Sequence, residues 1–458
     1  MEQINQFLTR QRKQTTKIHC VGDAMIDEYY DVKVERISPE APVPILHSTS
    51  PVPETMPGGV ANVAYQYRHM NVDSKLICCS NFYSQGIFNR CNLNHTSSKN
   101  HNINLPIKKR FLENGVQIHR WDIEKKYRMY IDHQQELIGQ IQELPDAAIL
   151  SDYNKGFFVP GFAQQWLQKY KNCYTFVDPK NGPLDQWKGC YVFKPNKKEA
   201  EILSQGIIDP KEQCDYFRKQ LNCHSVIITH GGDGVCGNVN GEYFEYNSSS
   251  KVQLPESVIG AGDCFSAFFV QAIALGMEVI DACIVGFEAG AVYVRNRMNR
   301  PIVAAELSQD GIISAEDLRY RDFKLVFTNG CFDLIHRGHL ETLRFAKQQG
   351  EKLVVALNSD DSIRRLKGED RPIKSLVERE AVMAAFDFVD FVISFEEDTP
   401  YEAIKKCMPD ILVKGSDYEL KDIVGADLVK EVIRSPIFGN LSTTGLLTRS
   451  IGVGTGKS

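Results

Sequence analysis

The chain has 458 residues, of which 43% are hydrophobic and 24% are charged, and its formal net charge is −5. This length allows two or three domains with separate cores. The slightly acidic balance argues against a nucleic-acid coat and against a polybasic membrane surface, so we expect neither nucleic acid nor membrane as a partner. No stretch approaches the roughly 20 consecutive apolar residues of a membrane span.

The 13 cysteines are scattered and include no Cys-x-x-Cys spacing. An odd number of unpatterned cysteines in a large chain is typical of a reduced, cytoplasmic protein. The first 17 residues are polar and lack the apolar core of a signal peptide. We therefore expect a cytoplasmic location.

Apolar strand-like segments alternate with helix-like segments along most of the chain, which predicts α/β layers with parallel sheets. In the first half, polar and small residues follow each apolar segment, at the position where ligands bind in open parallel sheets. Strands are predicted at residues 18–22, 147–150, 175–177, 192–194 and 225–228. Residues 82–104 are rich in Asn, Ser and His and poor in apolar residues, so we expect a loop there.

Two glycine-rich segments each open a predicted helix in the first half. Gly58-Gly59 begins a helix that continues to about Met70, and Gly260-Ala261-Gly262-Asp263 begins another. Glycines at a helix start leave backbone N–H groups free to face an anion, and Asp263 could accept the proton of a hydroxyl that attacks the γ-phosphate of ATP. By itself the Gly-x-Gly-Asp pattern is a weak signal, since an Asp at that position also suits the helix dipole.

The second half is organised around residues 328–339, which contain His336-x-Gly338-His339. This segment lies between the apolar run 323–327 and a predicted helix at 340–349. A helix start suits a phosphate, and both histidines could donate to that phosphate. The pattern indicates attack by a phosphate on the α-phosphorus of a nucleoside triphosphate, with pyrophosphate leaving. Histidines that merely cap the helix are the simpler alternative, and no third ligand with a recognisable spacing supports zinc.

A polar segment at residues 304–322 separates the two halves. We predict a first domain over residues 1–310, a linker over 311–322 and a second domain over 323–458. The tail from Gly452 to Ser458 has a P-loop-like composition, but the spacing is wrong and no helix can follow it, so we predict a flexible tail.

The second half resembles the cytidylyltransferase-like nucleotidyltransferases. In order and spacing its motifs are similar to the adenylyltransferase half of the bifunctional ADP-heptose synthase family. The resemblance implies a Rossmann-like domain in which His336 and His339 are catalytic. The residues that it assigns to nucleotide binding are Thr328, Asn329, Gly330, Phe332, Asp333, Gly338, Asn358, Asp360, Lys367, Arg371, Lys414, Gly415, Asp417, Ser442, Thr443 and Thr444.

The first half resembles the ribokinase-like carbohydrate kinases, and residues 36–44 and 151–156 are similar to the heptose-phosphate kinase half of the same bifunctional family. The resemblance implies a parallel-sheet domain with a small lid and Asp263 as the catalytic base. It assigns sugar binding to Asp27, Gly58, Gly59, Asn62, Lys109, Asp152 and Lys155. It assigns ATP binding to Asn196, Lys197, Lys198, Glu199, Thr229, Gly231, Gly234, Gly260, Ala261 and Gly262, with Glu199 near Mg²⁺ but not directly bound to it.

The family implies two reactions. The first phosphorylates D-glycero-D-manno-heptose 7-phosphate at its anomeric hydroxyl with ATP and Mg²⁺. The second transfers AMP from ATP to heptose 1-phosphate and gives ADP-heptose for the lipopolysaccharide core, after a separate phosphatase has removed the 7-phosphate. The relatives also imply a homo-oligomer, and we expect a dimer. The only partners that we expect besides a second copy are sugar phosphates and ATP.

Some departures from the family pattern keep alternatives open. Ser257 and Ile259 stand where the family has Asp and Thr, which questions the geometry of the kinase anion site. A kinase-like binding domain without turnover, beside an active nucleotidyltransferase, is therefore one alternative. A second is the same pair of folds acting on another sugar phosphate. The His-x-Gly-His pattern also serves cytidylyl transfer to polyol phosphates, and by itself it does not choose adenine over cytosine.

Overall fold

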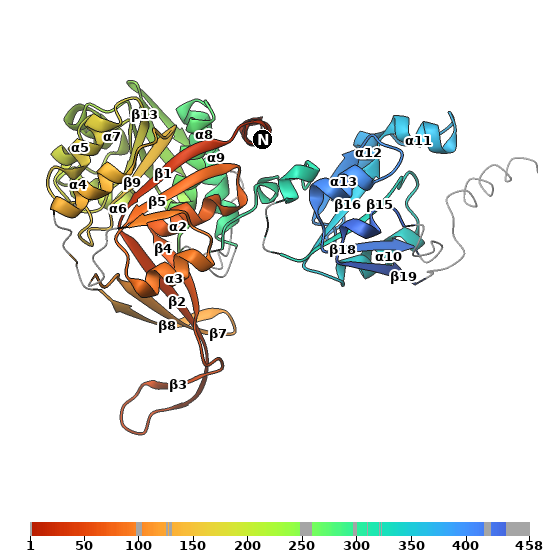
Figure 1. Cartoon of the computed structure of the whole chain (residues 1–458), viewed down its shortest axis with the longest axis horizontal. Coiled ribbons are helices and arrows are strands. Elements are labelled where there is room, and N and C mark those ends of the chain that lie inside the picture. Colours follow the sequence, from red (N-terminus) through yellow and green to blue (C-terminus); the bar gives the residue numbers. More distant parts are fainter. Residues whose placement is uncertain are drawn as a thin grey trace, which may run out of the picture. The chain divides into compact units, whose positions relative to one another are not determined.

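The computed structural model of the chain divides into two compact units, Met1–Ile302 and Val303–Ser458 (Figure 1). The structure describes residues 2–97, 103–124, 127, 131–247, 259–295, 300–308, 310–319, 321, 323–415 and 423–436. Five residues named above lie outside this described part, namely Ser257, Asp417, Ser442, Thr443 and Thr444, as does the tail from Gly452.

The first unit is built on a nine-stranded sheet with the order β14-β13-β12-β11-β10-β9-β1-β5-β6. The strands from β6 to β12 pair in parallel, and β13 and β14 add an antiparallel edge. The predicted parallel sheet and its five predicted strands are confirmed. The strands are β1 (Thr16–Gly22), β5 (Val72–Cys78), β6 (His95–Ser97), β9 (Ala147–Ser151), β10 (Tyr174–Asp178), β11 (Val192–Phe193), β12 (Ser225–Thr229), β13 (Val235–Val239) and β14 (Glu242–Tyr246).

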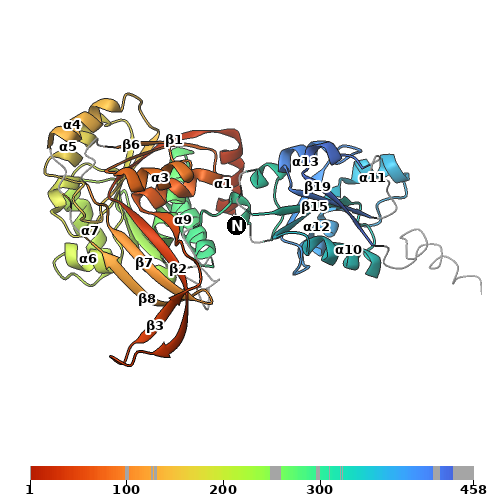
Figure 2. The same ribbon diagram turned by 60° about the horizontal axis from the view of Figure 1, so that its bottom comes forward.

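Helices cover both faces of this sheet, with α5 and α7 on one side and α8 and α9 on the other (Figures 1 and 2). Because α8 lies between the sheet and α9, it is not amphipathic: most of its residues are apolar and buried. The helices are α1 (Glu2–Lys13), α2 (Val60–Gln66), α3 (Phe82–Arg90), α4 (Ile131–Gln140), α5 (Phe162–Lys169), α6 (Lys197–Leu203), α7 (Pro210–Leu221), α8 (Ala261–Ala274) and α9 (Val279–Tyr293), with short 3-10 turns η1 (Tyr67–His69), η2 (Leu184–Trp187) and η3 (Gly231–Asp233).

The loop predicted over residues 82–104 is wrong for most of its length, because α3 begins it and β6 follows. Asn81 caps α3: its side chain accepts from the Ser84 N–H at 2.9 Å, and the Asn81 N–H donates to Ser84 Oγ at 2.9 Å. The segment has few apolar residues, but Ile87 and Phe88 lie together on one face and are buried. A short helix needs only one such face, so low apolar content alone does not predict a loop.

A smaller sheet forms the lid of the first unit (Figures 1 and 2). Its order is β3-β2-β7-β8, and β4 also pairs with β2. The strand β2 begins within the body of the unit and runs out into the lid, so it carries residues of both parts. The lid strands are β2 (Ala24–Ile37), β3 (Pro44–Ser48), β4 (Glu54–Gly59), β7 (Ile107–Glu113) and β8 (Val116–Ile123).

The second unit contains a parallel five-stranded sheet with the order β17-β16-β15-β18-β19. The chain starts in the centre at β15 and then winds outward in both directions, which is the Rossmann-like arrangement that we expected. Its strands are β15 (Leu325–Gly330), β16 (Lys352–Asn358), β17 (Phe391–Phe395), β18 (Ile411–Gly415) and β19 (Glu431–Ser435). Its helices are α10 (Arg337–Lys347), α11 (Asp360–Lys367), α12 (Leu376–Ala384) and α13 (Tyr401–Cys407), with the short turns η4 (Ala304–Leu307), η5 (Ala315–Leu318) and η7 (Ala426–Leu428).

The second unit begins at Val303, earlier than the sequence predicted. Ile312 forms a parallel bridge to Val392 in β17, and the Ile313 N–H donates to the Val392 carbonyl at 3.0 Å. Val303 and Leu318 are fully buried in the same apolar cluster as the strand residues of this unit. The segment 311–322, which we expected to be a linker, therefore contributes to a domain core.

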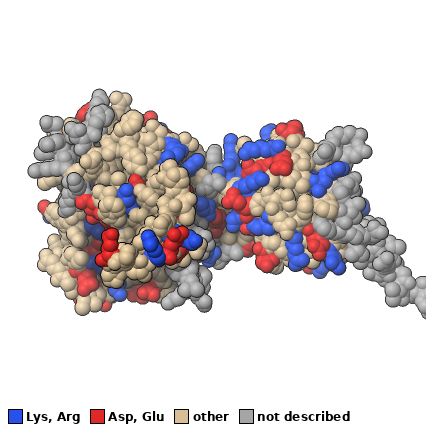
Figure 3. Space-filling view, turned by 90° about the horizontal axis from the view of Figure 1, so that it is seen from below, with Lys and Arg blue, Asp and Glu red and all other residues tan. Residues whose placement is uncertain are grey.

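None of the helices in the described part of the chain has the length and apolarity that crossing a membrane requires. On the face shown in Figure 3, Lys and Arg side chains lie among Asp and Glu side chains in both units. The mixed surface agrees with the small net charge of the chain.

Candidate active sites

The first candidate site lies where β1 and β9 end side by side. The sheet order reverses between these two strands, because β5 lies on the far side of β1. Ligands bind at such a reversal in open parallel sheets. Asp23 directly follows β1, and the loop that begins at Asp152 follows β9. The Asp23 N–H donates to the Ser151 carbonyl at 3.1 Å, which ties the two strand ends together.

Asp263 is held at the start of α8 by two hydrogen bonds. Asn62 Nδ2, from α2, donates to Asp263 Oδ2 at 2.8 Å, and the Tyr153 hydroxyl donates to Asp263 Oδ1. The preceding Gly260 has a φ of +78°, and a Cβ there would lie 2.6 Å from the Tyr293 hydroxyl. The helix start can therefore come this close to Asn62 and Tyr293 only with glycine at position 260.

The Asp263 carboxyl is poised to take a proton. Its exposed fraction is only 7%, and burial raises its pKa from the usual 3.8 to about 6. The hydrogen bonds from Tyr153 and Asn62 oppose this rise, while the charges of Asp178 and Asp27 add to it. The carboxylate is thus a stronger base than an ordinary Asp and is still ionised at neutral pH, which suits a general base.

Asp27, predicted to bind sugar, forms a buried ion pair with Arg110 of the lid strand β7. Arg110 Nη1 lies 2.5 Å from Asp27 Oδ1, and both side chains are almost fully buried. A Cβ at Gly58 would lie 2.6 Å from Asp27 Oδ2, so Gly58 leaves room for this carboxylate. Arg110 was not among the residues predicted to bind sugar. The only available signal was its position on a strand beside two lysines, and nothing in the sequence identified Asp27 as its partner.

Lys109, the lid residue that we expected at the sugar, lies on the opposite face of the lid sheet from Asp27. Lys109 pairs in register with Glu28, and successive strand residues point to opposite faces. Its Nζ lies 3.4 Å from Glu28 Oε2 and 3.2 Å from the Tyr30 hydroxyl. Sugar binding by Lys109 stays a prediction. The pairing of β7 with β2 sets the strand register and thereby places Lys109 on the other face from Asp27.

The face that carries Asp27 also carries Lys108, Arg110 and Arg120. Lys108 pairs in register with Asp27 and with Asp122, and Arg110 pairs with Arg120 of β8. Arg120 Nη2 in turn lies 2.6 Å from Asp122 Oδ2. Three cations thus share this face with the carboxylates of Asp27, Asp31, Glu54 and Asp122, and Lys108 and Arg110 lie directly beside the carboxylate that we expect to contact sugar hydroxyls.

Two other predicted sugar residues, Asp152 and Lys155, lie in the loop after β9. Asp152 Oδ1 accepts from the Asn154 N–H at 2.7 Å, and Lys155 Nζ lies 2.8 Å from Glu124 Oε2. Both side chains thus already have protein partners. Asp152 and Lys155 belong to the same loop as Tyr153, whose hydroxyl donates to Asp263.

The predicted nucleotide residues begin at the start of α6. Asn196 and Glu199 cap this helix reciprocally, with the Asn196 N–H donating to Glu199 Oε2 at 2.9 Å and the Glu199 N–H donating to Asn196 Oδ1 at 3.0 Å. The other Glu199 oxygen accepts from Lys180 Nζ at 2.8 Å. Lys197 and Lys198 are exposed at the same helix start, where their charges can meet a phosphate.

The predicted nucleotide loop lies next to this helix start, because Thr229 forms a parallel bridge to Asn196. The loop turns tightly from β12 to β13, with φ values of +62° at Gly231 and +124° at Gly234. A Cβ at Gly234 would lie 2.4 Å from the Tyr246 carbonyl oxygen. The structure therefore brings the two predicted nucleotide segments together, although 30 residues separate them in the sequence.

The second candidate site surrounds the start of α10. The rings of His336 and His339 stack with centroids 3.8 Å apart, and the His336 N–H donates to His339 Nδ1 at 3.4 Å. Phe332 lies against His339 at 5.1 Å between centroids and has a φ of +44°. Burial lowers the pKa of both histidines, that of His339 to about 4, and the charges of His336 and Lys367 lower the latter further. Both imidazoles are therefore neutral at pH 7 in the free protein.

Asp333 fixes the loop that follows α11. Its carboxylate accepts from the Ile373 and Lys374 N–H groups, both at 2.9 Å, and from Arg371 Nε at 2.6 Å. Although burial acts in the opposite direction, these hydrogen bonds lower the pKa of Asp333. The side chain of Asp333 is 1% exposed, so its role is to hold this loop in place.

Arg379, which our sequence analysis did not select, joins three loops of this site. Its Nη1 donates to the carbonyls of Cys331 at 2.9 Å and Asn358 at 2.8 Å, and its Nη2 donates to Asp360 Oδ1 at 2.6 Å. Its Nε donates to the Lys374 carbonyl at 3.1 Å. No local sequence pattern indicated Arg379, because its burial and its four partners are known only from the structure.

Six predicted nucleotide residues lie at the carboxyl ends of β15, β16 and β18, namely Thr328, Asn329, Gly330, Asn358, Lys414 and Gly415. Lys414 Nζ donates to Asn329 Oδ1, which joins the ends of β18 and β15. Asn358 Nδ2 donates to Ser362 Oγ at 3.1 Å, and Thr328 is buried in β15. The structure thus brings these residues to one edge of the sheet, as expected for a Rossmann-like domain.

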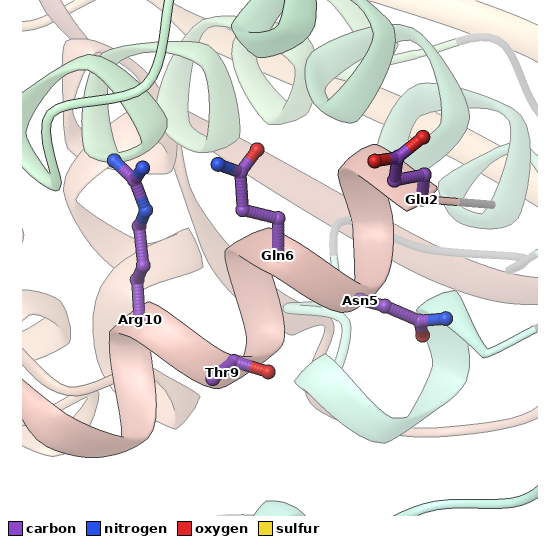
Figure 4. Close-up of a pocket in the computed structure, with 5 residues that line it drawn as sticks. All are labelled: Glu2, Asn5, Gln6, Thr9 and Arg10. Atoms are coloured by element: carbon purple, nitrogen blue, oxygen red, sulfur yellow. The ribbon is translucent and has the colours of Figure 1, made fainter.

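A separate hollow lies along α1 and contains none of the predicted site residues. It is lined by Glu2, Asn5, Gln6, Thr9 and Arg10. Figure 4 shows Glu2, Gln6 and Arg10 on one side of the helix, a turn apart. Arg10 Nη1 donates to the Leu275 carbonyl at 2.9 Å, which gives this side chain a structural role in the first unit.

Two family models match the chain, one in each half. The model described as pfkB family carbohydrate kinase matches residues 15–301, and the model described as Cytidylyltransferase-like matches residues 327–443. The predicted order of a kinase domain followed by a nucleotidyltransferase domain is confirmed.

Curated relatives match almost the whole chain. The bifunctional protein HldE of Campylobacter jejuni subsp. doylei is 35% identical over 459 residues, which cover 93% of this chain and 95% of the relative. The bifunctional protein HldE of Nitratiruptor sp. is 34% identical and covers 94% of this chain and 98% of the relative. The bifunctional protein HldE of Shewanella piezotolerans is 31% identical, and the match covers 91% of this chain and 92% of the relative.

Solved structures resemble the first part of the chain. The tetrameric inhibited form of phosphofructokinase-2 from Escherichia coli has a TM-score of 0.53 at 16% identity and covers 65% of this chain and 100% of that one. The same protein in complex with potassium has a TM-score of 0.54 at 17% identity and covers 64% and 96%. At this identity the likeness supports the fold of the first unit and nothing further.

Proposed function

Because the chain belongs to the family of the bifunctional HldE proteins, we propose that it makes ADP-heptose in two separate transfer steps. The chain is a bifunctional transferase with a carbohydrate kinase half and a nucleotidyltransferase half, and both use ATP. We propose that the kinase substrate is D-glycero-D-manno-heptose 7-phosphate and that the nucleotidyltransferase substrate is heptose 1-phosphate. Both are small metabolites of the cytoplasm, where we place the protein.

In the kinase step, Asp263 takes the proton of the anomeric hydroxyl as its oxygen attacks the γ-phosphorus of ATP. The bond from that phosphorus to the ADP oxygen breaks as the new bond forms. The N–H groups from Gly260 to Gly262 face the transferred phosphoryl group at the start of α8. The buried position of Asp263, its raised pKa and its place beside this helix start support the assignment.

The lid provides the opposite end of the kinase site. Asp27 accepts hydrogen bonds from sugar hydroxyls, and the cationic face formed by Lys108, Arg110 and Arg120 takes the phosphate that the sugar already carries. Support comes from the register of the lid strands, which places these cations beside Asp27. A heptose 7-phosphate fits this polarity, because its phosphate is at the other end of the sugar from the anomeric hydroxyl.

At the nucleotide end, Lys197 and Lys198 meet the phosphates of ATP, together with the loop from Thr229 to Gly234. ATP reaches a kinase with Mg²⁺, which neutralises phosphate charge in the transfer. Both Glu199 oxygens already accept hydrogen bonds from Lys180 and from the Asn196 N–H, so Glu199 would reach this ion through water rather than directly.

In the adenylyl transfer step, the phosphate of heptose 1-phosphate attacks the α-phosphorus of ATP, and pyrophosphate leaves. His336 and His339 donate to the phosphates at the start of α10, and Lys367, Arg371 and Lys414 supply positive charge around them. The roles of Ser442, Thr443 and Thr444 as phosphate ligands stay a prediction from the family pattern.

The experiment that tests this function is product analysis with purified protein. One reaction contains ATP, Mg²⁺ and heptose 7-phosphate, and the other contains ATP, Mg²⁺ and heptose 1-phosphate. We expect a heptose bisphosphate in the first and ADP-heptose with pyrophosphate in the second. A nucleotide sugar without any bisphosphate would contradict the kinase assignment and would leave a kinase-like binding domain. No product in either reaction would mean that the two folds act on another sugar phosphate.

A further inference from the structure

Two residues from different parts of the fold hold the Asp263 carboxylate, one at each oxygen. Asn62 donates to Oδ2 at 2.8 Å, and the Tyr153 hydroxyl donates to Oδ1. Asn62 is itself fixed, because Gln66 Nε2 donates to its Oδ1 at 3.1 Å and thereby turns its Nδ2 toward Asp263. Asn62 and Gln66 are completely buried.

Asp23 anchors both of these donors. Its carboxylate accepts from the N–H groups of Tyr153 at 2.9 Å, Lys155 at 3.0 Å and Phe157 at 3.0 Å, which shapes the loop that carries Tyr153. Its carbonyl oxygen accepts from the N–H of Val60 at 3.0 Å, at the start of the helix that carries Asn62. The Tyr127 hydroxyl also donates to the Asp23 carboxylate, at 3.0 Å.

The anchor is rigid for a physical reason. Asp23 is completely buried, and its carboxylate has four hydrogen-bond donors around it. Hydrogen bonds to a buried charge are strong, and removing the charge would leave several N–H groups unpaired. The positions of Tyr153 and Asn62 are therefore coupled through one completely buried residue.

We infer that Tyr153 is a positioning residue of the kinase reaction, which keeps the Asp263 carboxylate ionised and oriented, and that Asp23 anchors Tyr153 and Asn62 for this task. The inference rests on the proposed kinase function of Asp263. Burial by itself favours the protonated acid, which cannot take a proton from a sugar hydroxyl. A hydrogen bond from the Tyr153 hydroxyl stabilises the ionised form.

The Tyr153 hydroxyl does not block the reaction. Each carboxylate oxygen has two lone pairs, so Oδ1 can accept from Tyr153 and from a substrate hydroxyl at once. When the substrate O–H bond breaks, the proton moves to the Asp263 carboxyl and the substrate oxygen bonds to the γ-phosphorus. The hydrogen bond from Tyr153 thus keeps the base ionised before the transfer and has no need to open.

The test is the substitution Tyr153→Phe, followed by the pH dependence of kinase kcat/KM. We expect the acid limb of the profile to move up by about one to two pH units, because the variant lacks a hydrogen bond to a charged group. At pH 7 the rate should fall by about two- to tenfold, and it should approach the wild-type rate at high pH. A loss of the same size at every pH would overturn the inference, since it would show a purely structural role.

The matched control is Tyr170→Phe, which removes another buried tyrosine hydroxyl in the same unit. Tyr170 donates to the Ile141 carbonyl at 3.1 Å. We expect its pH profile to match the wild type. The adenylyl transfer activity of the same chain serves as an internal measure of protein concentration and should be unchanged in both variants.

A second measurement does not depend on turnover and separates this inference from the proposed function. Carbon-13 labelling of the Asp carboxyl groups allows their titration by NMR, and Asp263→Asn assigns the Asp263 signal. We expect Tyr153→Phe to raise the titration midpoint of Asp263 by about one to two pH units even if the sugar substrate has been misidentified. An unchanged midpoint would overturn the inference, whereas absent kinase activity with a shifted midpoint would overturn only the proposed function.

Discussion

Arg110 and Asp27 form a buried ion pair between two neighbouring lid strands, with 2.5 Å between Nη1 and Oδ1. The lid strand β7 supplies the arginine, and Asp27 lies on β2 beside Gly58. A carboxylate in this position needs a cation, because an isolated buried charge is costly. The pair thus links the stability of the unit to the shape of the predicted sugar site.

Replacing Arg110 with Met should leave Asp27 charged and buried without its partner. We expect the first unit to lose about 3 to 5 kcal/mol of unfolding free energy, measured by urea denaturation. The control is Arg120→Met, which removes a partly exposed pair with Asp122 and should cost no more than about 1 kcal/mol. Equal losses in the two variants would contradict the special role of the Asp27 pair.

The kinase rate should depend on the ionisation of Asp263. Its pKa is raised to about 6 by burial, and only the ionised form can take a proton. We therefore expect kinase kcat/KM to fall as the pH drops through about 6 and to lose about tenfold per further pH unit. Adenylyl transfer by the same chain does not use this carboxyl, so an identical acid limb in both activities would contradict the assignment.

Asp263→Asn should abolish kinase activity and make the first unit more stable at neutral pH. A carboxyl whose folded pKa lies above its unfolded pKa stabilises the fold only at low pH, and this contribution is lost as the pH rises through the folded pKa. At pH 8 the buried, ionised Asp263 therefore destabilises the fold. We expect the neutral variant to gain about 1 kcal/mol or more of unfolding free energy. Denaturation at pH 8 and pH 5 would measure this, and the gain should shrink at the lower pH.

His336→Ala should remove adenylyl transfer and leave the kinase untouched. The histidine lies at the start of α10 and stacks on His339, so its loss removes a phosphate donor and loosens the second one. We expect adenylyl transfer to fall by about a hundredfold or more, measured as pyrophosphate release. Kinase activity of the same variant is the control, and unaltered pyrophosphate release would exclude His336 from the site.

Arg379→Gln should also impair adenylyl transfer, although Arg379 is not expected to touch substrate. It joins the loops that carry Cys331, Asn358 and Lys374, so its loss should displace several nucleotide ligands at once. We expect a higher KM for ATP together with a lower kcat. The control Arg364→Gln breaks an exposed pair with Asp361 in the same unit and should leave both parameters within about twofold.

The border between the units can be tested with shortened chains. A chain of residues 303–458 keeps Val303, Ile313 and Leu318, which are part of the core of the second unit, whereas a chain of residues 323–458 lacks them. Because each buried aliphatic side chain stabilises a fold by about 1.5 to 3 kcal/mol, we expect only the longer piece to unfold cooperatively on heating. Equal melting temperatures would show that residues 303–322 do not contribute to this core.

Much of the molecule could be predicted from its sequence, because the signals are local. The apolar runs predicted five strands of the first parallel sheet and β15 of the second, and Gly-x-Gly-Asp and His-x-Gly-His predicted the helix starts at Gly260 and His336. The helix at Phe82–Arg90 was missed because one short buried face is hidden in a polar composition. Arg110 and Arg379 were missed because their partners lie on other segments of the chain, which no local pattern identifies.

The sequence by itself determined the fold class, the order of the two units and the chemistry of the residues at the strand ends. These features follow from local signals: the periodicity of apolar residues in strands and helices, and glycine where the backbone requires it. Such signals span only a few residues, so the sequence alone shows them. Only the tertiary structure decided which side chains meet: that Arg110 rather than Lys109 reaches Asp27, and that Asp23 anchors both groups that hold Asp263. These contacts depend on strand register and on segments more than 30 residues apart, and no local pattern carries that information.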